Sequence, residues 1–225
     1  MNIQAILFMC NDFNRAKFTL ENFYKWHKNI PIKVINSGGA DPAPYLQHIP
    51  TTTFVNVDNL WHKKTHCGKG SFDYRFFEYL FDYGLNPFFD YTLFLETDIL
   101  TNRPISIVPK FDISGPITPC NEKEKKLYEY LQIPPPFHHT CCGATIYKYS
   151  YFKTITENNN FSFFVDTFKK FPQHYYMDLI ATLAARLNGL SFGHWEEISN
   201  IPGHFVNGHW HQTNYNATLI HNYKI

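Results

Sequence analysis

The sequence has 225 residues, enough for one large domain or for a tight pair of smaller units, and its hydrophobic share of 44% is normal for a globular protein. The net charge is only +1 at neutral pH, so no overall field favours nucleic acid or an anionic membrane surface. No apolar run approaches the roughly 20 residues that span a bilayer, and the first residues lack the basic region of a signal peptide. We therefore expect a cytoplasmic protein with no membrane span and no nucleic-acid partner.

The five cysteines are an odd number without the spacing of a disulfide framework, so we expect reduced thiols. Two segments are rich in zinc-type ligands, His138-His139-Thr140-Cys141-Cys142 and His209-Trp210-His211, but neither has the spacing of a zinc motif. We expect these segments to line an acceptor side instead. There Trp195, Trp210 and Tyr215 would stack on a sugar ring.

The first quarter of the chain predicts parallel strands joined by a helix. Residues 3–10 are almost continuously apolar, which is typical of a strand buried on both faces. Apolar side chains then recur at helical spacing over 13–27, and Pro31 ends the helix. A second strand is expected at 32–35 and a short third at 53–57. Strand, helix and strand within about 35 residues form a βαβ unit with a parallel pair of strands.

The middle of the chain continues the alternation of helix and strand. Apolar side chains on one face predict a helix from Phe72 that stops at Gly84. A strand at 91–95 follows and ends directly in Glu96-Thr97-Asp98. Further along, the pattern predicts strands at 105–108 and 112–117, a charged helix at 122–131, and a proline-rich junction at 134–136.

The second half of the chain repeats short strands and helices. The expected elements are a loop and strand over 138–147, helices at 161–171 and from about Asp178 to Gly189, and strands at 190–192 and 217–221. The two halves together predict an α/β fold with a mixed, mainly parallel central sheet flanked by helices.

The acidic triplet is the most informative functional signal. Open α/β sheets bind ligands at the carboxyl ends of their strands. Carboxylates there suit a hard cation such as Mg²⁺ or Mn²⁺, and a cation at that place usually holds phosphate. Asp98 is the expected metal ligand, with Glu96 near the ribose or a metal-bound water. The triplet alone is also compatible with an ordinary acidic turn after a strand.

Further polar groups are expected at the same edge. His221 would complete the metal coordination, and Lys224 would bring positive charge to the phosphates, although a lone C-terminal histidine is more often inert. The turn Asn36-Ser37-Gly38-Gly39-Ala40-Asp41 allows close approach of the backbone and offers hydrogen bonds to a base or ribose. Met9-Cys10-Asn11-Asp12 would line the same crevice.

Two more positions are candidates for a role in transfer. Lys69, between two glycines, would contact a pyrophosphate if its loop is more than a solvated one. Asp178 either caps the N-terminus of its helix or is a general base that takes a proton from an acceptor hydroxyl, and the two roles are compatible. Glu196 and Glu197 are alternative bases.

In their order along the chain, these motifs resemble the GT-A family of glycosyltransferases. That family has a βαβ nucleotide-binding unit, a strand ending in D-x-D, a later helix that starts in an acid, and a histidine near the end of the domain. Residues 9–12, 36–41, 96–98, 178–180 and His221 follow that order over almost the whole chain. The first acid here is glutamate rather than aspartate, which departs from the family pattern at the ribose contact but not at the metal ligand.

The resemblance implies one GT-A-like catalytic domain over 1–225, with a nucleotide-sugar and metal-binding half at 1–118 and an acceptor-binding half at 137–225. It implies a UDP- or GDP-type nucleoside-diphosphate sugar as donor, Mn²⁺ or Mg²⁺ as cofactor, and a glycan hydroxyl as acceptor. With Asp178 as base, the reaction would invert the anomeric carbon. The compact, aromatic and Asn/Lys-rich chain is also similar to glycosyltransferase domains of large DNA viruses, which would place it in a host cytoplasm.

Two other classes of protein fit some of the pattern. A nucleotidyltransferase or phosphohydrolase also places acids at strand ends, but usually with a richer acid cluster or a glycine-rich basic loop near the first strand. A non-catalytic carbohydrate-binding domain would use the aromatic tail, and its sugar binding would survive the replacement of Asp98.

Overall fold

The structure is a computed structural model that describes residues 1–225 except 10–11, 39, 51, 58–74, 141–142, 171–176 and 225, and except the side chains of 168–170. The helices are α1 (Phe13–Trp26), α2 (Ala43–Leu46), α3 (Arg75–Gly84), α4 (Glu122–Tyr130), α5 (Tyr149–Glu157), α6 (Phe161–Lys170) and α7 (Met177–Leu187). The strands are β1 (Ile3–Met9), β2 (Ile32–Asn36), β3 (Thr52–Asn56), β4 (Tyr91–Leu95), β5 (Leu100–Thr101), β6 (Ile113–Gly115), β7 (Ile117–Pro119), β8 (His138–Thr140), β9 (Thr145–Lys148), β10 (Phe192–His194), β11 (Ile198–Asn200), β12 (His204–Val206), β13 (His209–His211) and β14 (Leu219–His221).

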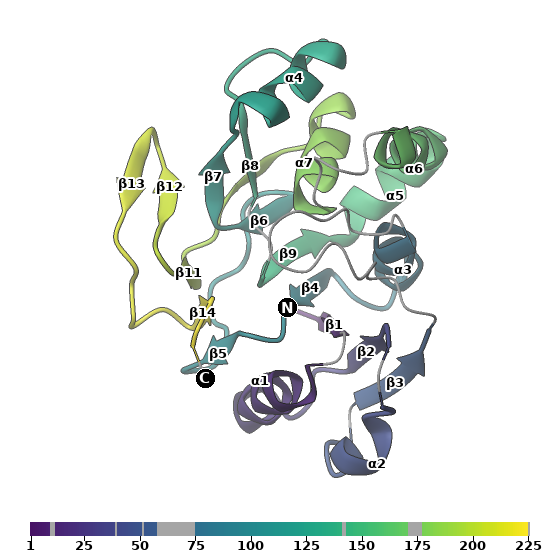
Figure 1. The fold of residues 1–225 in the computed structure, drawn as a ribbon, viewed down its shortest axis with the longest axis vertical. Helices are drawn as coiled ribbons and strands as arrows, with labels where there is room; N and C mark the ends of the chain where they lie inside the picture. Colours follow the sequence, from purple (N-terminus) through teal and green to yellow (C-terminus); the bar gives the residue numbers. More distant parts are fainter. Residues whose placement is uncertain are drawn as a thin grey trace.

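A seven-stranded sheet forms the centre of the molecule, in the order β10-β6-β9-β4-β1-β2-β3 (Figure 1). Every neighbouring pair is parallel except the two that involve β9, which runs antiparallel to β4 and to β6. The predicted mixed, mainly parallel sheet is therefore confirmed. Strands from before and after the proline run 134–136 share this one sheet.

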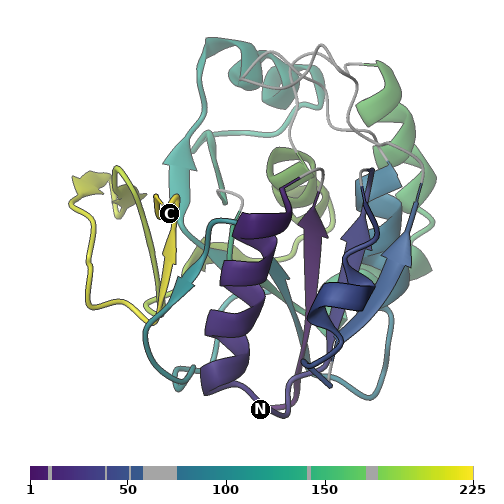
Figure 2. The ribbon, with the colours of Figure 1, turned by 60° about the horizontal axis from the view of Figure 1, so that its bottom comes forward.

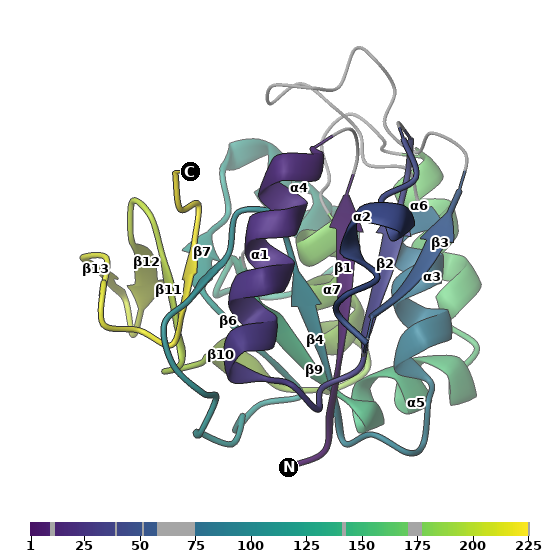
Figure 3. The same ribbon diagram turned by 90° about the horizontal axis from the view of Figure 1, so that it is seen from below.

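Helices cover both faces of the sheet. In Figures 2 and 3, α1 and α2 lie on one face, and Figure 3 shows α3, α5 and α6 on the other. Strand β1, which is apolar except for the buried Gln4, contributes to both layers, because Ala5 and Leu7 belong to one buried cluster and Ile6 and Phe8 to the other. Successive side chains of β1 point to opposite faces, and both faces are buried. The strand therefore does not show the alternation of apolar and polar residues that is typical of a half-exposed strand.

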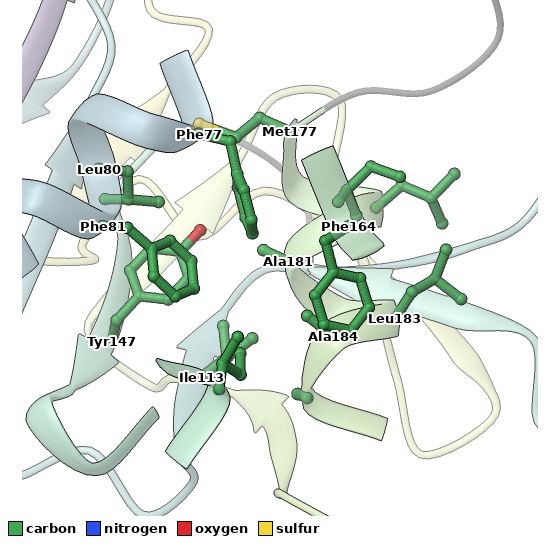
Figure 4. Packing of buried hydrophobic residues seen from close by; sticks show 14 of the residues in the cluster. Phe77, Leu80, Phe81, Ile113, Tyr147, Phe164, Met177, Ala181, Leu183 and Ala184 are labelled. Carbon is green, nitrogen blue, oxygen red and sulfur yellow. The ribbon is translucent and has the colours of Figure 1, made fainter. Parts of the chain in front are cut away.

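The larger hydrophobic cluster lies under α3, α5, α6 and α7. Figure 4 shows Phe77 of α3 pointing toward Ala181 of α7, and Phe164 of α6 beside Ala184. The small side chains on α7 leave room for the aromatic rings of its neighbours. Across the described helices, none has the length and apolar character needed to cross a membrane.

Some predicted strands differ from those observed. No strand forms at 105–108, because the backbone N–H groups of Ser106 and Ile107 donate to the Glu197 carboxylate instead of to a neighbouring strand. The strand expected at 112–117 is divided into β6 and β7 at Pro116, which has no N–H to donate. The expected strand at 190–192 is shifted to β10, and the start of the helix predicted from Phe72 lies outside the described residues.

The register of the parallel strands determines what meets at their carboxyl edge. Leu7 of β1 lies opposite Leu95 of β4, and Met9 lies opposite Asn36 of β2. Glu96, which follows Leu95, therefore emerges at the same edge as the ends of β1 and β2.

Candidate metal and nucleotide site

Three ligand-type side chains meet just beyond the end of β4. The Nε2 atom of His221 lies 2.7 Å from Oε2 of Glu96 and 3.6 Å from Oδ1 of Asp98. One ligand atom from each residue lies within 4.8 Å of the others. Two carboxylates and an imidazole around one point can hold a divalent cation such as Mn²⁺.

The short strand β5 explains how a histidine near the end of the chain reaches the triplet. β5 begins after Ile99, which follows Glu96-Thr97-Asp98, and it pairs antiparallel with β14, whose last residue is His221. Helix α1 holds this segment from the side: Thr19 exchanges hydrogen bonds of 3.2 Å with the backbone of Ile99, and Asn22 accepts the Thr101 N–H at 2.6 Å. The position of the site thus depends on the packing of α1 against the chain after β4.

The electrostatics of Asp98 fit a bound cation. Burial raises the pKa of Asp98, His221 lowers it, Glu96 raises it, and the more distant Arg15 lowers it, with a net rise. Its Oδ1 atom is buried and has no hydrogen-bond partner among the described residues. Because a desolvated carboxylate oxygen without a partner is costly, a cation that meets this oxygen would stabilise the site. The donor set and this oxygen together fit a divalent metal.

Gly143 is a site residue that the sequence patterns do not reveal. A Cβ atom added there would lie 2.3 Å from the His221 ring, and the φ of Gly143 is +86°, a conformation that favours glycine. Gly143 therefore packs directly against the proposed metal ligand. A glycine shortly before an apolar strand is the only signal in the sequence, and it does not indicate which residue the glycine contacts.

The ends of β1 and β2 are joined by hydrogen bonds. The Ser37 hydroxyl and N–H both donate to the carbonyl of Met9, at 3.2 and 2.9 Å. The Asn36 amide donates to Oδ1 of Asn56 at 2.8 Å and to the carbonyl of Ala40 at 3.2 Å. The Oδ1 of Asn36 is buried without a hydrogen-bond donor among the described residues. Asn36 thus keeps one free acceptor at this edge, whereas the Ser37 hydroxyl is already used.

Other predicted nucleotide contacts surround this edge. Gly38 has a φ of +128°, which suits the glycine expected in the turn. Asp41 is exposed, and its Oδ1 accepts the N–H of Ala43 at 3.0 Å. The hydrogen bond from the Ala43 backbone, followed by one from Asn56, lowers the pKa of Asp41. Two predicted contacts, Asn11 and Lys69, lie outside the described residues.

The C-terminal segment is anchored beside the acidic triplet. The N–H of Tyr223 donates to the carbonyl of Asp98 at 3.1 Å, and the Tyr223 ring stacks on Phe18 of α1 at a centroid distance of 6.1 Å. Lys224 follows immediately and is exposed. The predicted cation therefore lies one residue beyond a backbone contact with the proposed metal ligand.

Asp178 lies in a different, closed environment. It is 4% exposed in the first turn of α7, and its Oδ2 is 3.5 Å from Nδ1 of His139. Burial alone lowers the pKa of His139, but the hydrogen bond and charge of Asp178, together with Glu124, raise it above its ordinary value. The structure thus pairs Asp178 with His139.

Two residues named as acceptor-side candidates have structural roles instead. Glu197 is fully buried and accepts hydrogen bonds from Ser106, Ile107 and Thr218, so its oxygens are occupied. Burial tends to raise the pKa of Glu197, but these hydrogen bonds hold it below its ordinary value. Trp195 is also fully buried, and its indole N–H donates to the carbonyl of Ile107, so it cannot stack on a sugar from solvent. Burial of this kind is not visible in the local sequence.

Two of the remaining acceptor-side candidates, His138 and Glu196, line a cavity of about 560 Å³ beside the edge strand β10, whereas Trp210 and Tyr215 are not part of its lining. Its lining includes His138, His194, Glu196 and Phe205. Trp210, on the neighbouring hairpin of β12 and β13, remains 63% exposed. A hollow lined by aromatic and polar side chains is the kind of surface on which a sugar can bind.

Comparison with solved structures finds glycosyltransferases of the same fold. The chain is similar to the bifunctional glycosyltransferase WbbM, with a TM-score of 0.59, 9% identity, and coverage of 98% of this chain and 45% of WbbM. It is similar to the galactosyltransferase LgtC in complex with donor and acceptor sugar analogues, with a TM-score of 0.56, 12% identity, and coverage of 97% of this chain and 86% of LgtC. It is also similar to the core-mannan synthase CmsA from Aspergillus fumigatus in its Mn/GDP form, with a TM-score of 0.55, 8% identity, and coverage of 87% and 73%.

These similarities define the fold. The chain has a GT-A-like glycosyltransferase fold, and it spans less than half the length of WbbM. No protein-family model matches the sequence. No curated protein matches it either.

Proposed function

We propose that this chain is a metal-dependent glycosyltransferase that moves a sugar from a UDP- or GDP-type nucleoside-diphosphate sugar to a glycan hydroxyl. The observation that carries the proposal is the group Glu96, Asp98 and His221 at the carboxyl edge of a sheet with a glycosyltransferase fold. Two fold neighbours support the ligands: CmsA was solved with manganese and GDP, and LgtC with donor and acceptor sugar analogues.

Asp98 and His221 would hold a divalent cation, Mn²⁺ or Mg²⁺, with Glu96 beside them. When bound, the cation offsets the negative charge that develops on the departing diphosphate. Lys224 and Arg15 add positive charge to the same region, since Lys224 follows the segment bonded to Asp98 and the charge of Arg15 acts on Asp98. These side chains provide the electrostatic environment that favours loss of a diphosphate.

The nucleoside would bind at the ends of β1 and β2. The unpaired Oδ1 of Asn36 offers an acceptor to a base or ribose, and the exposed Asp41 lies at the other end of the same predicted turn. Gly38 presents uncharged backbone there, whereas the Met9 side chain is 2% exposed and belongs to the hydrophobic core rather than to the crevice that it was expected to line. This arrangement leaves the diphosphate between the nucleoside and the proposed metal ligands.

The acceptor would enter from the second half of the chain, where the cavity beside β10 lies. That Asp178 is the base that deprotonates the acceptor remains a prediction. Inversion of the anomeric carbon, which follows from that role, remains a prediction too. A general base must reach the reacting hydroxyl, directly or through one water. Because the Asp178 carboxyl is nearly buried and faces His139, an acceptor hydroxyl would have to enter between α7 and β8 to reach it.

The test is binding and turnover of a panel of UDP-, GDP- and dTDP-sugars, with and without Mn²⁺. We expect one donor to bind in a metal-dependent way. Without an acceptor, the enzyme should transfer its sugar slowly to water and so release the nucleoside diphosphate. Asp98→Asn should remove both effects, while Asp82→Asn, which changes an exposed carboxylate on α3, should leave them intact. Failure of every nucleoside diphosphate to bind, with or without metal, would refute the proposal.

A further inference from the structure

A second group of metal-type ligands lies away from the strand-end site. Cys120, Glu124 and His139 each place one ligand atom within 4.8 Å of the other two. All three residues are about 5% exposed, and Asp178 lies next to His139 at 4%. The residues come from the position directly after β7, the first turn of α4, and β8, and α7 lies beside β8 (Figure 1). No short sequence motif contains this combination, because 15 residues separate Glu124 from His139.

The hydrogen bonds of His139 leave one ring nitrogen for a ligand. Its Nδ1 lies 2.7 Å from the carbonyl of Thr140, to which only an N–H can donate, and 3.5 Å from Oδ2 of Asp178. Nε2 points to the other side, 3.8 Å from Oε2 of Glu124. Histidines that bind metals usually donate the other ring N–H to a carbonyl or carboxylate in this way, which fixes the tautomer.

The distance between His139 Nε2 and Glu124 Oε2 is too long for a hydrogen bond and suits two ligands of one ion. Two ligand atoms about 2.1 Å from a tetrahedral zinc ion are roughly 3.4 Å apart, and slightly more when the angle opens. The sulfur of Cys120 lies within 4.8 Å of the ligand atoms of the other two residues, so it can supply a third ligand. Oε2 of Glu124 is held in place, because it also accepts the N–H of Asn121 at 2.7 Å in the capping box of α4.

The charges of this buried group also favour a cation. Glu124 and Asp178 bring two carboxyl groups into a dry region, at 3.8 and 3.5 Å from the two ring nitrogens of His139. The guanidinium of Arg186 donates to the carbonyls of Pro134 and Pro136. Buried carboxylates are stable only when a counter-charge is present.

We propose that Cys120, Glu124 and His139 bind a zinc-type transition-metal ion, with Asp178 as the positioning residue behind His139. Sulfur and imidazole ligands select zinc over the Mg²⁺ or Mn²⁺ of the strand-end site. The ion would tie the start of α4 to β8, which packs on α7 through Thr140 and Thr182. β8 leads to Gly143, which lies against His221, so the ion would support the segment that packs on the strand-end site.

Cobalt substitution of the purified chain, prepared without a histidine tag, tests the proposal by absorbance. We expect about one Co²⁺ per chain with a thiolate-to-cobalt charge-transfer band, and displacement of the cobalt by Zn²⁺. Cys120→Ser, which nearly preserves volume, should remove the band and weaken Zn²⁺ retention about tenfold or more, with the circular dichroism spectrum unchanged. Asp98→Asn and the exposed-site control His48→Gln should keep the band.

Two further variants complete the test. If Cys120→Ser does not fold, Glu124→Gln is measured for Zn²⁺ stoichiometry, and we expect a loss there as well. The double change Cys141→Ser with Cys142→Ser should keep the charge-transfer band. A chain that binds no Co²⁺ or Zn²⁺ through Cys120, or a band that follows Cys141 and Cys142 instead, would overturn the proposal and leave His139 as the centre of an ion-pair network.

Discussion

Two groups of acids around a histidine lie among the described residues, and they differ in their access to solvent. At the strand-end group, the side chains of Glu96 and Asp98 are 27% and 19% exposed, whereas those of Glu124 and Asp178 beside His139 are each 6% exposed. Metal sites that react with substrates keep an open position, and structural sites are closed by protein ligands. The same residue types therefore suit a substrate-binding role in one place and a supporting role in the other.

The largest expected effect is on turnover at the open group. Asp98→Asn should lower the rate of sugar transfer by about 10²–10³-fold, because stabilisation of a leaving diphosphate by a metal is worth several kcal/mol. The free energy of unfolding should change little, since the partly exposed Asp98 side chain has no hydrogen-bond donor to Oδ1 among the described residues. A steady-state assay with urea unfolding as the companion measurement checks both. Equal turnover by the variant would remove the open group from the reaction.

Asp178→Asn tests whether the closed group also takes part in the chemistry. If Asp178 is the general base, kcat should fall by about 10²-fold while donor binding stays unchanged. An effect confined to stability, with kcat of the folded protein intact, would assign Asp178 to the support of His139 alone. Donor affinity by calorimetry and kcat at saturating donor separate these two results.

Glu124→Gln should reduce stability more than turnover. The change weakens the capping box of α4 and alters a buried carboxyl group, so we expect a loss of about 1–3 kcal/mol in the free energy of unfolding. Glu129→Gln, on the exposed side of the same helix, is the matched control and should change it by less than about 0.5 kcal/mol. Similar losses for both variants would contradict a closed, specifically bonded group.

Gly143→Ala tests how the segment after β8 affects the open group. The added methyl group would collide with the His221 ring. The backbone at position 143 also has a φ of +86°, which alanine disfavours. We expect about tenfold weaker metal affinity from displacement of His221, and a modest loss of stability. Unchanged metal affinity in calorimetry would show that the position of His221 does not depend on this contact.

The smallest expected effect is on the pH dependence of stability and comes from His204 in β12. The pKa of His204 is shifted in the opposite direction to that of His139. Burial, followed by the neighbouring His194 and His211, lowers the pKa of His204 to about 4, whereas the acids beside His139 raise its pKa. A histidine with a lowered pKa takes up protons more readily when unfolded, so its stabilising contribution is present above pH 6.5 and is lost as the pH falls towards 4. We expect wild type to lose about 1–2 kcal/mol more than His204→Phe between pH 7 and pH 5 in urea unfolding.

The elements that the sequence predicts well are those with strong local patterns. The apolar run of β1, the helical spacing of α1 and the isolated strand β4 allowed each to be placed within one or two residues. The pattern did not predict the helices α2 and α5 or the strands β5, β11, β12 and β13. These strands have two or three residues each, too few for a period to appear. Residues 105–108 look like a strand because nothing in their sequence reveals the distant Glu197 that binds their N–H groups.

The residues of the candidate sites also fall into those that local sequence predicts and those that it does not. Glu96 and Asp98 could be found because they follow a buried strand, and His221 because it ends the last one. Gly143 and the group of Cys120, Glu124 and His139 could not, because their meaning depends on contacts between segments that only the fold brings together.

The most direct test of the strand-end metal site is an electron paramagnetic resonance titration of Mn²⁺ in the presence of UDP or GDP. We predict about one bound Mn²⁺ per wild-type chain, lost in Asp98→Asn and retained in Cys120→Ser and Asp82→Asn. Mn²⁺ binding that is the same in wild type and Asp98→Asn would contradict the assignment of the strand-end acids as the metal site of this protein.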